Sequence, residues 1–398
     1  MRLDLAWHAV ESNRFGTNEF VRFCRKVGAE PYLAVNCGDG DMREARDWVE
    51  YCNGTRDTAL VRLRKQHGYE APHQVKYWGI GNEVDGDWQI GHKTPQEYAR
   101  AYTEFGKVMR WADPGIRLLA SATSAWKADF VERTQLLLEQ APDLVDYLAI
   151  HWYVGNREND FATYMALSEL FEERLTAIEG VMAAMRLARG IVRPIHIAVD
   201  EWNVWYRTGS KENLEEAYNL EDALVNAMQL NAFIRHARSV RMANLAQIVN
   251  VIAPILTRPD GLVLQTIFHP LELYRRTCGD EALDVHWAGD TFEGGGRTGV
   301  RVLDVAASLD TEGGRLVLFI VNRTTDRASE AEVVLVGGRL AGPVEVHVIN
   351  GPDIKAANTF DAPDTVRVRT ERVQARGPAM ASTLEPHSVT VLVCPLAK

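Results

Sequence analysis

Short apolar runs alternate with helical patterns along much of the chain, and this alternation constrains the fold more than any other feature. Runs typical of strands occupy residues 31–36, 75–81, 117–122, 147–153, 195–201 and 245–251. Helical patterns occupy residues 18–27, 42–52, 94–111, 129–140, 161–188, 220–237 and 270–276. The strand runs are continuously apolar rather than alternating, which indicates that both of their faces are covered. Repeated strand–helix units of this kind predict a parallel α/β fold.

The parallel fold that this pattern favours is the (β/α)8 barrel of the TIM type. No GxGxxG or P-loop motif stands at a strand–helix junction, which argues against a dinucleotide-binding fold. A closed barrel needs eight units, and the six strand runs supply six of them. Because the helix at 18–27 has no strand run before it, we expect about two units upstream of Met1. A chain starting at Met1 would expose two unpaired strand edges, which favours aggregation.

After Cys278 the pattern changes to short alternating runs separated by Gly, Pro and Asp clusters. These runs occupy residues 300–309, 315–322, 331–336, 344–350, 366–373 and 388–394. They predict an antiparallel β-sandwich, of jelly-roll type. We therefore expect a barrel domain at 1–277 and a sandwich domain at 278–398. The sandwich shows no catalytic constellation, so we interpret it as a packing or assembly surface, with carbohydrate binding as the alternative.

Composition favours a cytoplasmic enzyme that binds neither nucleic acid nor a membrane. The net charge of −10 argues against an anionic partner, and no run is long and apolar enough to span a bilayer. We interpret the basic cluster Arg62, Arg64 and Lys65 as a solvated helix face. The cysteines contain no CxxC pair, which favours buried free thiols in a reducing compartment. They are Cys24, Cys37, Cys52, Cys278 and Cys394.

Two of the expected strands end at a glutamate. Glu83 closes the segment YWGIGNE at 77–83, and Glu201 lies in IHIAVDEW at 195–202. A charge at the carboxyl end of a buried strand is costly and needs a chemical reason. Paired carboxylates are the minimal equipment for cleaving a glycosidic bond, and we expect these two to meet in space. The structural alternative is that one or both form a buried salt bridge.

Several longer motifs surround these glutamates. They are LDLAW at 3–7, EYCN at 50–53, GNE at 81–83, WQIGHK at 88–93, DEWNVWY at 200–206 and LAQIVNVIAP at 245–254. With them the stretch from Leu3 to Gln265 resembles the catalytic domain of the α-L-arabinofuranosidases of glycoside hydrolase family 51. The Asn-Glu pair is shared by a whole clan of barrel glycosidases, whereas the DEWNVWY and AQIVNVIAP runs are specific to this family.

The resemblance implies a retaining hydrolase that removes terminal α-L-arabinofuranosyl residues from arabinan- or arabinoxylan-type oligosaccharides. Glu83 would be the general acid/base after the fourth barrel strand, and Glu201 the nucleophile after the seventh. Retaining chemistry places such carboxyls about 5–5.5 Å apart. Because the acid must hold a proton near neutrality, we expect burial and nearby negative charge to raise the pKa of Glu83.

The resemblance also implies sugar-binding roles for five further residues. These are Asn82, His151, Tyr153, Trp205 and Gln247. His151 and Tyr153 lie on one face of their strand because strand side chains alternate, and ordinary packing or capping remains the alternative for each of the five. No metal is expected at His151, since no second histidine stands at ligand spacing, and no cofactor is expected. A homo-oligomer, by resemblance a hexamer, is expected.

The sequence also departs from the family pattern. Nothing in residues 1–30 matches the glutamate of the family's first strand or the Arg-Trp-Pro-Gly-Gly-Asn-like segment of its second. Cys37 and Asp39 replace an aliphatic residue and a threonine. Two other functions therefore stay open. One is an endo-glucanase or β-xylosidase that uses the same glutamates, and the other is an inactive sugar-binding or assembly subunit.

Overall fold

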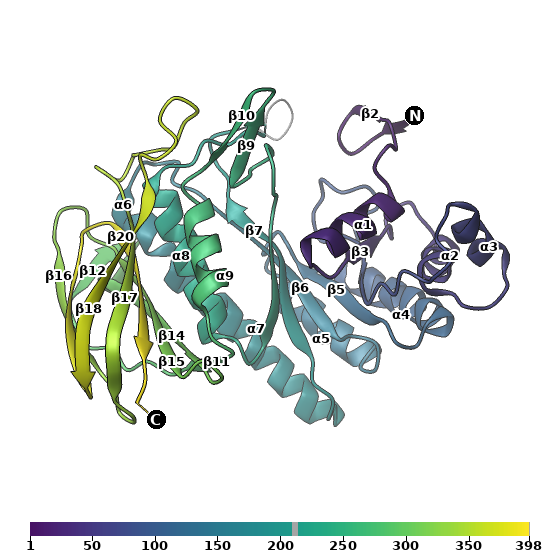
Figure 1. The fold of residues 1–398 in the computed structure, drawn as a ribbon. Helices are drawn as coiled ribbons and strands as arrows, with labels where there is room; N and C mark the ends of the chain where they lie inside the picture. The colour runs from purple at the N-terminus through teal and green to yellow at the C-terminus, as the bar shows by residue number, and fades with distance from the viewer. Residues whose placement is uncertain (209–213, 398) are drawn as a thin grey trace. The chain divides into compact units, whose positions relative to one another are not determined.

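In the computed structural model, which describes residues 1–208 and 214–397, six strands form one sheet in sequential order (Figure 1). They are β3 (Tyr32–Val35), β4 (Tyr77–Ile80), β5 (Arg117–Thr123), β6 (Tyr147–Val154), β7 (His196–Val204) and β8 (Val240–Leu245). The pairs from β3 to β6 are parallel, with Tyr32 opposite Tyr77 and Tyr77 opposite Arg117. This confirms the predicted six-stranded part of a TIM-type barrel.

Helices follow the strands as the alternation predicts. They are α1 (Thr17–Val27), α2 (Met42–Asn53), α3 (Ala59–Gln66), α4 (Pro95–Ala112), α5 (Phe130–Gln140), α6 (Phe161–Met165), α7 (Leu167–Arg189), α8 (Leu220–Arg235) and α9 (Phe268–Thr277). Helix α2 packs against α3 and α4, and α4 against α5 (Figure 1). Helix α4 starts sharply because the Thr94 hydroxyl accepts from the Glu97 amide while the Glu97 carboxylate accepts from the Thr94 amide.

The chain divides into two compact units. The first unit comprises Met1–Trp152, Thr176–Asp200 and Ser239–Ala243, and the second comprises Tyr153–Leu175, Glu201–Arg238 and Asn244–Lys398. The domain boundary expected at 277/278 coincides with the end of α9 and the change to antiparallel strands, and as a boundary between domains it stays a prediction. Helix α8 packs against antiparallel strands that follow it in the sequence, which places it in the second unit.

Antiparallel sheets dominate the second unit. One has the order β11 (Glu281–Leu283), β14 (Leu303–Asp310), β15 (Arg315–Asn322), β20 (Ser388–Pro395), β17 (Leu340–Asn350), β18 (Arg367–Gly377). Strand β16 (Ser329–Val334) pairs with β19 (Ala379–Leu384), and side chains of both sheets share one apolar core, as in a sandwich. Three further hairpins were not predicted: β1 (Arg2–Asp4) with β2 (Ala9–Glu11), β9 (Ile255–Arg258) with β10 (Gly261–Leu264), and β12 (Thr291–Gly294) with β13 (Arg297–Arg301).

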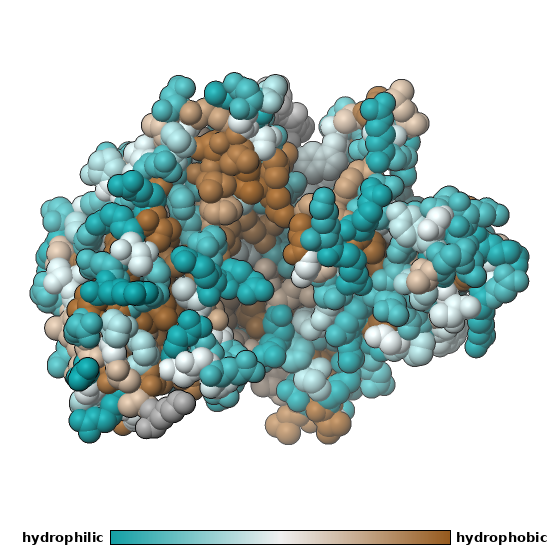
Figure 2. Space-filling view, viewed as in Figure 1, coloured by the Kyte–Doolittle hydropathy of each residue, from teal (hydrophilic) through white to brown (hydrophobic). Residues whose placement is uncertain are grey.

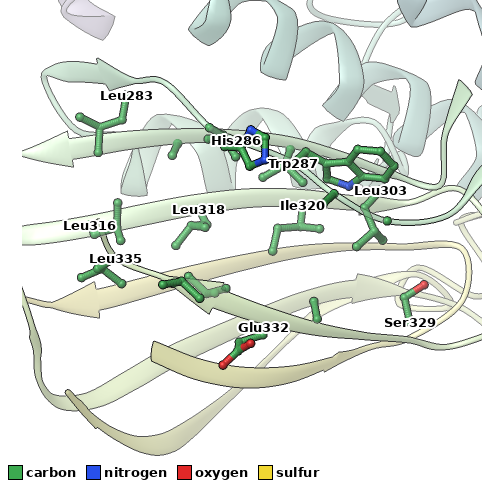
Figure 3. A pocket seen from close by; sticks show the side chains of 18 of the residues that line it. Leu283, His286, Trp287, Leu303, Leu316, Leu318, Ile320, Ser329, Glu332 and Leu335 are labelled. Atoms are coloured by element: carbon green, nitrogen blue, oxygen red, sulfur yellow. The ribbon is translucent and has the colours of Figure 1, made fainter. Parts of the chain in front are cut away.

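A cavity of about 1030 Å³ opens inside the antiparallel part of the second unit. Its wall includes Leu316, Leu318 and Ile320, three residues that alternate along β15, and Figure 3 shows their side chains on one side of the strand. Leu283 and Leu303 line it from neighbouring segments. Because this part of the lining is aliphatic, we interpret the cavity as incompletely filled space between the two sheets.

Apolar side chains also reach the surface of the first unit. Figure 2 shows apolar atoms gathered near the carboxyl end of α7, where Leu187 is 87% and Val192 is 92% exposed. A few exposed apolar residues of this kind are common on protein surfaces and need no functional explanation. Within residues 1–208 and 214–397, no helix combines the length and the apolar character that crossing a bilayer requires.

Two element predictions are wrong in their boundaries. The strand expected at 245–251 ends where it was expected to begin, because the Asn203 side chain binds the carbonyls of Ala246 and Ile252 and shapes the following residues into a loop. The helix expected at 161–188 is divided into α6 and α7. At the division the Met165 carbonyl accepts a hydrogen bond from the Arg323 guanidinium at 3.2 Å instead of continuing the helical ladder.

Two predictions about exposure are also wrong. Arg64 does not lie on a solvated helix face but is 1% exposed, and its guanidinium donates to the carbonyls of Tyr51, Gly54 and Tyr69. Those carbonyls end a helix or lie in loops, so they need a buried donor. Cys278 is exposed, whereas the other four cysteines are buried free thiols as expected.

Aromatic packing between α9 and β15 generates a stability prediction. The rings of Tyr274 and Phe319 lie with their centroids 4.3 Å apart, and Phe319 has no solvent exposure. Phe319→Ala should lower the free energy of unfolding in urea by about 3–5 kcal/mol, because a buried ring is lost and a cavity remains. Val336→Ala, at a fully exposed site, serves as the control and should change it little. Equal effects of the two changes would contradict the described core.

Candidate active site

Glu83 follows β4 in a turn that most residues adopt with difficulty. Gly81 has φ 78° and Glu83 has φ 49°, both in the left-handed region. A β-carbon at residue 81 would lie 2.5 Å from Cys37 Sγ and 2.6 Å from Val84 Cγ1, so only glycine fits there. A left-handed glutamate costs on the order of 1–3 kcal/mol and persists only where its surroundings fix it. The turn therefore presents Glu83 at the carboxyl end of β4 under backbone strain.

Three side chains bind the Glu83 carboxylate. His151 Nδ1 lies 2.9 Å from Oε1, while Trp88 Nε1 donates to Oε2 at 2.6 Å and Gln89 Nε2 donates to Oε2 at 3.3 Å. The Trp88 ring covers Gly86 so closely that a β-carbon there would lie 2.4 Å from it. The carboxylate is thus held in one orientation by partners on both of its oxygens.

These contacts contradict the expectation that the pKa of Glu83 is raised. Burial does raise the pKa of this carboxyl, but the hydrogen bond and charge of His151 and the hydrogen bonds from Trp88 and Gln89 outweigh it. The pKa of Glu83 therefore lies below its usual value, since each donor stabilises the ionised form. As it stands in the structure, the carboxyl is prepared to accept a proton rather than to donate one.

A second carboxylate of the first unit lies on the other side of His151. Asp200, on β7, has Oδ1 at 3.5 Å from His151 Nε2, and its Oδ2 accepts from the Tyr32 hydroxyl at 2.9 Å. His151 is buried, and its carbonyl accepts from Trp126 Nε1 at 2.8 Å. The imidazole ring is therefore fixed between two carboxylates that come from different strands.

In the second unit, Glu201 and two aromatic residues form a group. The Tyr153 hydroxyl donates to Glu201 Oε2 at 2.9 Å. The Trp205 ring meets the Tyr153 ring edge-on, with centroids 5.7 Å apart. Trp205 Nε1 donates to the Thr208 hydroxyl at 3.2 Å, which donates in turn to the buried Glu216 carboxylate at 2.8 Å. These hydrogen bonds hold the Trp205 indole beside Tyr153, the residue that donates to Glu201.

The remaining predicted residues lie in loops at strand ends. Asn82 is exposed and directly precedes Glu83. Gln247 is exposed and lies two residues after the end of β8, in the loop that Asn203 holds through the carbonyls of Ala246 and Ile252. Their exposure leaves both side chains available to a ligand, and their roles stay predictions.

The structure thus groups five of the seven predicted residues, His151 with Glu83, and Tyr153 and Trp205 with Glu201. The separation of the Glu83 and Glu201 carboxyls stays a prediction, because each glutamate belongs to a different unit.

Sequence reasoning missed three side chains of the group around Glu83 and His151. Trp88 and Gln89 belong to the WQIGHK motif, and their position a few residues after Glu83 allows contact within one loop, but no role was predicted for them. No role was predicted for Asp200, the neighbour of Glu201. Strand alternation directs Asp200 and Glu201 to opposite sides of β7, which was the available signal that the two carboxylates have different partners.

Comparison with protein families gives two matches that together span most of the chain. Residues 2–171 match the α-L-arabinofuranosidase 1 domain, and residues 200–388 match the α-L-arabinofuranosidase C-terminal domain.

Individual relatives and solved structures agree with these matches. The chain is 37% identical to intracellular exo-α-(1→5)-L-arabinofuranosidase 1 of Bacillus subtilis, over 92% of this chain and 75% of that protein. It is 39% identical to an intracellular exo-α-(1→5)-L-arabinofuranosidase of Halalkalibacterium halodurans, over 81% of this chain and 67% of that one. The arabinose complex of α-L-arabinofuranosidase from Thermotoga maritima superposes with a TM-score of 0.89 at 34% identity, over 98% and 81% of the two chains. A family 51 α-L-arabinofuranosidase from Bifidobacterium longum gives 0.92 at 29% identity, over 99% and 82%.

The contacts of Glu83 generate a prediction about its proton. Trp88→Phe removes one donor to the carboxylate, so the ionised form is less stable and the pKa of Glu83 should rise. The carboxyl ¹³C chemical shift of Glu83, followed against pH, measures this directly. Trp111→Phe, at an exposed tryptophan on α4, is the control and should leave the titration unchanged. An unchanged or lower pKa in Trp88→Phe would show that the Trp88 hydrogen bond does not control ionisation.

Proposed function

The chain belongs to the α-L-arabinofuranosidases of glycoside hydrolase family 51, and we propose that it removes non-reducing terminal α-L-arabinofuranosyl residues with retention of configuration. Arabinan- or arabinoxylan-type oligosaccharides are the proposed substrates. The relatives from Bacillus subtilis and Halalkalibacterium halodurans are named as exo-(1→5) enzymes, which favours arabinan-type ends for this chain as well.

The observation that carries the proposal is the way each glutamate is held. The Glu83 carboxylate is fixed by His151, Trp88 and Gln89, and the Glu201 carboxylate by the Tyr153 hydroxyl. Glu83 follows β4, and Glu201 lies in the carboxyl-terminal half of β7, a strand of the same sheet. Barrel enzymes carry their chemistry toward this end of their strands. Two oriented carboxylates of this kind suit double displacement at an anomeric carbon.

In the proposed first step, a Glu201 oxygen attacks the anomeric carbon of the arabinofuranosyl residue. The bond between that carbon and the leaving oxygen breaks, and the protonated Glu83 gives its proton to the leaving oxygen. The product is an ester between Glu201 and the sugar. In the second step Glu83, now ionised, takes a proton from water. The water oxygen attacks the anomeric carbon, and Glu201 leaves as a carboxylate.

The neighbouring residues suit supporting roles in this reaction. Tyr153 donates to Glu201 Oε2 and so orients the carboxylate. Trp205, whose ring contacts Tyr153, supplies an apolar wall for the sugar, and Asn82 and Gln247 supply exposed amides for its hydroxyls. His151 links Glu83 to Asp200 and orients the acid/base.

The lowered pKa of Glu83 makes proton supply part of the proposal. An acid catalyst must stay protonated until the leaving oxygen accepts its proton, yet the donors around Glu83 favour its ionised form. We infer that the bound substrate replaces some of these donors and excludes water, which raises the pKa of Glu83 in the complex. Once the leaving group has departed, these donors bind the Glu83 carboxylate again and favour the base form that the second step needs.

Location and assembly are part of the same proposal. The names of the two bacterial relatives describe intracellular proteins, and a cytoplasmic location is proposed here too. A homo-oligomer is proposed, with no cofactor and no metal in the reaction. The alternatives of an endo-glucanase, a β-xylosidase or an inactive sugar-binding subunit are outcomes of the experiments below.

Substitution of the two glutamates tests the roles directly, with aryl glycosides of arabinofuranose, xylose and cellobiose as substrates. Only the arabinofuranoside should be cleaved. Glu83→Ala should lose about 10²–10⁴-fold in activity, because acid/base catalysis is worth that much. Glu201→Ala should lose turnover altogether, since no covalent ester can form. Asp87→Asn, at an exposed carboxylate four residues after Glu83, is the matched control and should stay active.

Azide makes this test specific for each role. With Glu83→Ala it should attack the glycosyl-enzyme without base catalysis and give the azide of retained configuration. With Glu201→Ala it should attack the substrate directly and give the inverted azide. Exchange of these two products would reverse the assignment, and cleavage of the xyloside or cellobioside instead would favour the alternative glycosidases.

The proposed change in the pKa of Glu83 predicts two different pH limits. Activity falls as pH rises because the acid loses its proton. For kcat/KM this decline follows the pKa of Glu83 in the free enzyme, and for kcat it follows the pKa of Glu83 in the substrate complex. Because the pKa of free Glu83 is lowered and should rise with substrate bound, kcat/KM should decline at a lower pH than kcat. Both are measured with the aryl arabinofuranoside across the pH range. Coincident limits would contradict the inferred rise.

A further inference from the structure

We propose that Asp85 is a positioning residue that fixes the turn carrying Glu83 and thereby aims the Glu83 carboxyl at the leaving oxygen. This inference rests on the proposed role of Glu83 as acid/base. It concerns a carboxylate two residues beyond Glu83 that the proposed reaction does not otherwise use.

Asp85 is buried, and its carboxylate is bound by the loop after β5. Only 3% of the residue is exposed. Oδ2 accepts from the amides of Ser124 at 2.9 Å and Ala125 at 3.0 Å, and more weakly from the Thr123 hydroxyl at 3.4 Å. Oδ1 accepts from the Ser124 hydroxyl at 2.5 Å. These bonds tie the turn after β4 to the end of the neighbouring strand.

The turn needs such a tie because its backbone is strained at Glu83. The left-handed φ of 49° at Glu83 is closed locally by a hydrogen bond from the Gly86 amide to the Glu83 carbonyl at 2.8 Å. The Lys93 amide donates to the Val84 carbonyl at 2.7 Å. Both are short contacts within the same chain segment. Asp85 adds the connection from this segment to β5, so that the strained conformation is determined from outside as well.

The loop bound by Asp85 also leads back to the Glu83 carboxylate. The Trp126 amide donates to the Thr123 hydroxyl at 3.1 Å, and Trp126 Nε1 donates to the His151 carbonyl at 2.8 Å. His151 Nδ1 then lies 2.9 Å from Glu83 Oε1. The backbone of Glu83 is thus fixed through Asp85 and its carboxyl through His151, and one loop joins the two supports. Displacement at Asp85 should therefore move both ends of the Glu83 side chain.

Asp85 does not suit the role of acid/base itself. Burial raises the pKa of its carboxyl, but the hydrogen bonds from the Ser124 hydroxyl and the Ala125 and Ser124 amides outweigh this and hold it below its usual value. Both oxygens are engaged with donors. A carboxylate that is ionised and bound by donors is suited to hold backbone in place rather than to exchange protons with a substrate.

The test compares two aryl α-L-arabinofuranosides in the full chain. Phenol leaves poorly and needs the acid, whereas 2,4-dinitrophenol leaves without it. Asp85→Asn turns one acceptor into a donor that faces other donors, so the turn should shift. We expect kcat/KM for the phenyl substrate to fall by about 10²-fold, the cost of a misplacement near 1 Å, and kcat/KM for the dinitrophenyl substrate to change little. Asp87→Asn, an exposed carboxylate of the same turn, should leave both values unchanged.

Two further variants keep the outcomes distinct. Ser124→Ala removes the hydroxyl donor to Asp85 and keeps the backbone hydrogen bonds. It should show the same selective loss of kcat/KM for the phenyl substrate, but a smaller one. If Asp85→Asn does not fold, Ser124→Ala provides the test. Glu83→Ala, measured in parallel, reports on the acid itself. If Glu83→Ala shows the leaving-group dependence while Asp85→Asn loses both substrates equally, Asp85 is merely structural and the inference is overturned. If Glu83→Ala shows no such dependence, the proposed function of Glu83 falls, and the role of Asp85 falls with it.

Discussion

The imidazole of His151 joins carboxylates from two other strands, and the candidate site of the first unit depends on this interaction. Glu83 follows β4, His151 belongs to β6 and Asp200 to β7, so one ring connects residues of three strands or their turns. Buried carboxylates are costly unless donors satisfy them, and a protonated histidine can donate from both ring nitrogens. Without that ring, the ends of β4 and β7 would carry charges with fewer partners. The Tyr32 hydroxyl on Asp200 and the Trp126 indole on the His151 carbonyl extend the same network.

This network explains why the acid/base candidate is held in its ionised form. Among the described residues, Trp88 and Gln89 donate to Glu83 and His151 carries positive charge when protonated, so burial alone does not decide the pKa of Glu83. Such a site favours the step in which Glu83 acts as a base. In the proposed reaction, the protonated Glu83 that the acid step needs depends on the bound substrate. The same donors therefore set both the orientation of the carboxyl and its proton affinity in the structure. In the proposed reaction, the bound substrate raises that proton affinity.

Much of the fold was visible in the sequence because parallel strands covered on both faces leave continuous apolar runs. β5 and β6 begin at the predicted residues, and β4 and β7 lie within one to three residues of them. Strand β8 was misplaced, since the run at 245–251 is equally apolar and only the distant Asn203 amide makes it a loop. Arg64 was misread for a similar reason: its carbonyl partners are not readable from local pattern. Glu83 and Glu201 were found from their position at strand ends. The partners that set the pKa of Glu83 were not, because a motif does not show which side chain turns toward which.

The central claim is that Glu201 forms a covalent bond to the sugar while Glu83 transfers protons. The most direct measurement is mass spectrometry of the chain after reaction with a 2-fluoro arabinofuranoside that carries a good leaving group, which forms the ester quickly and hydrolyses it slowly. Peptide mapping should place one fluorosugar on Glu201, and a Glu201→Ala chain should take up none. A label on Glu83, or turnover without any covalent species, would contradict the account.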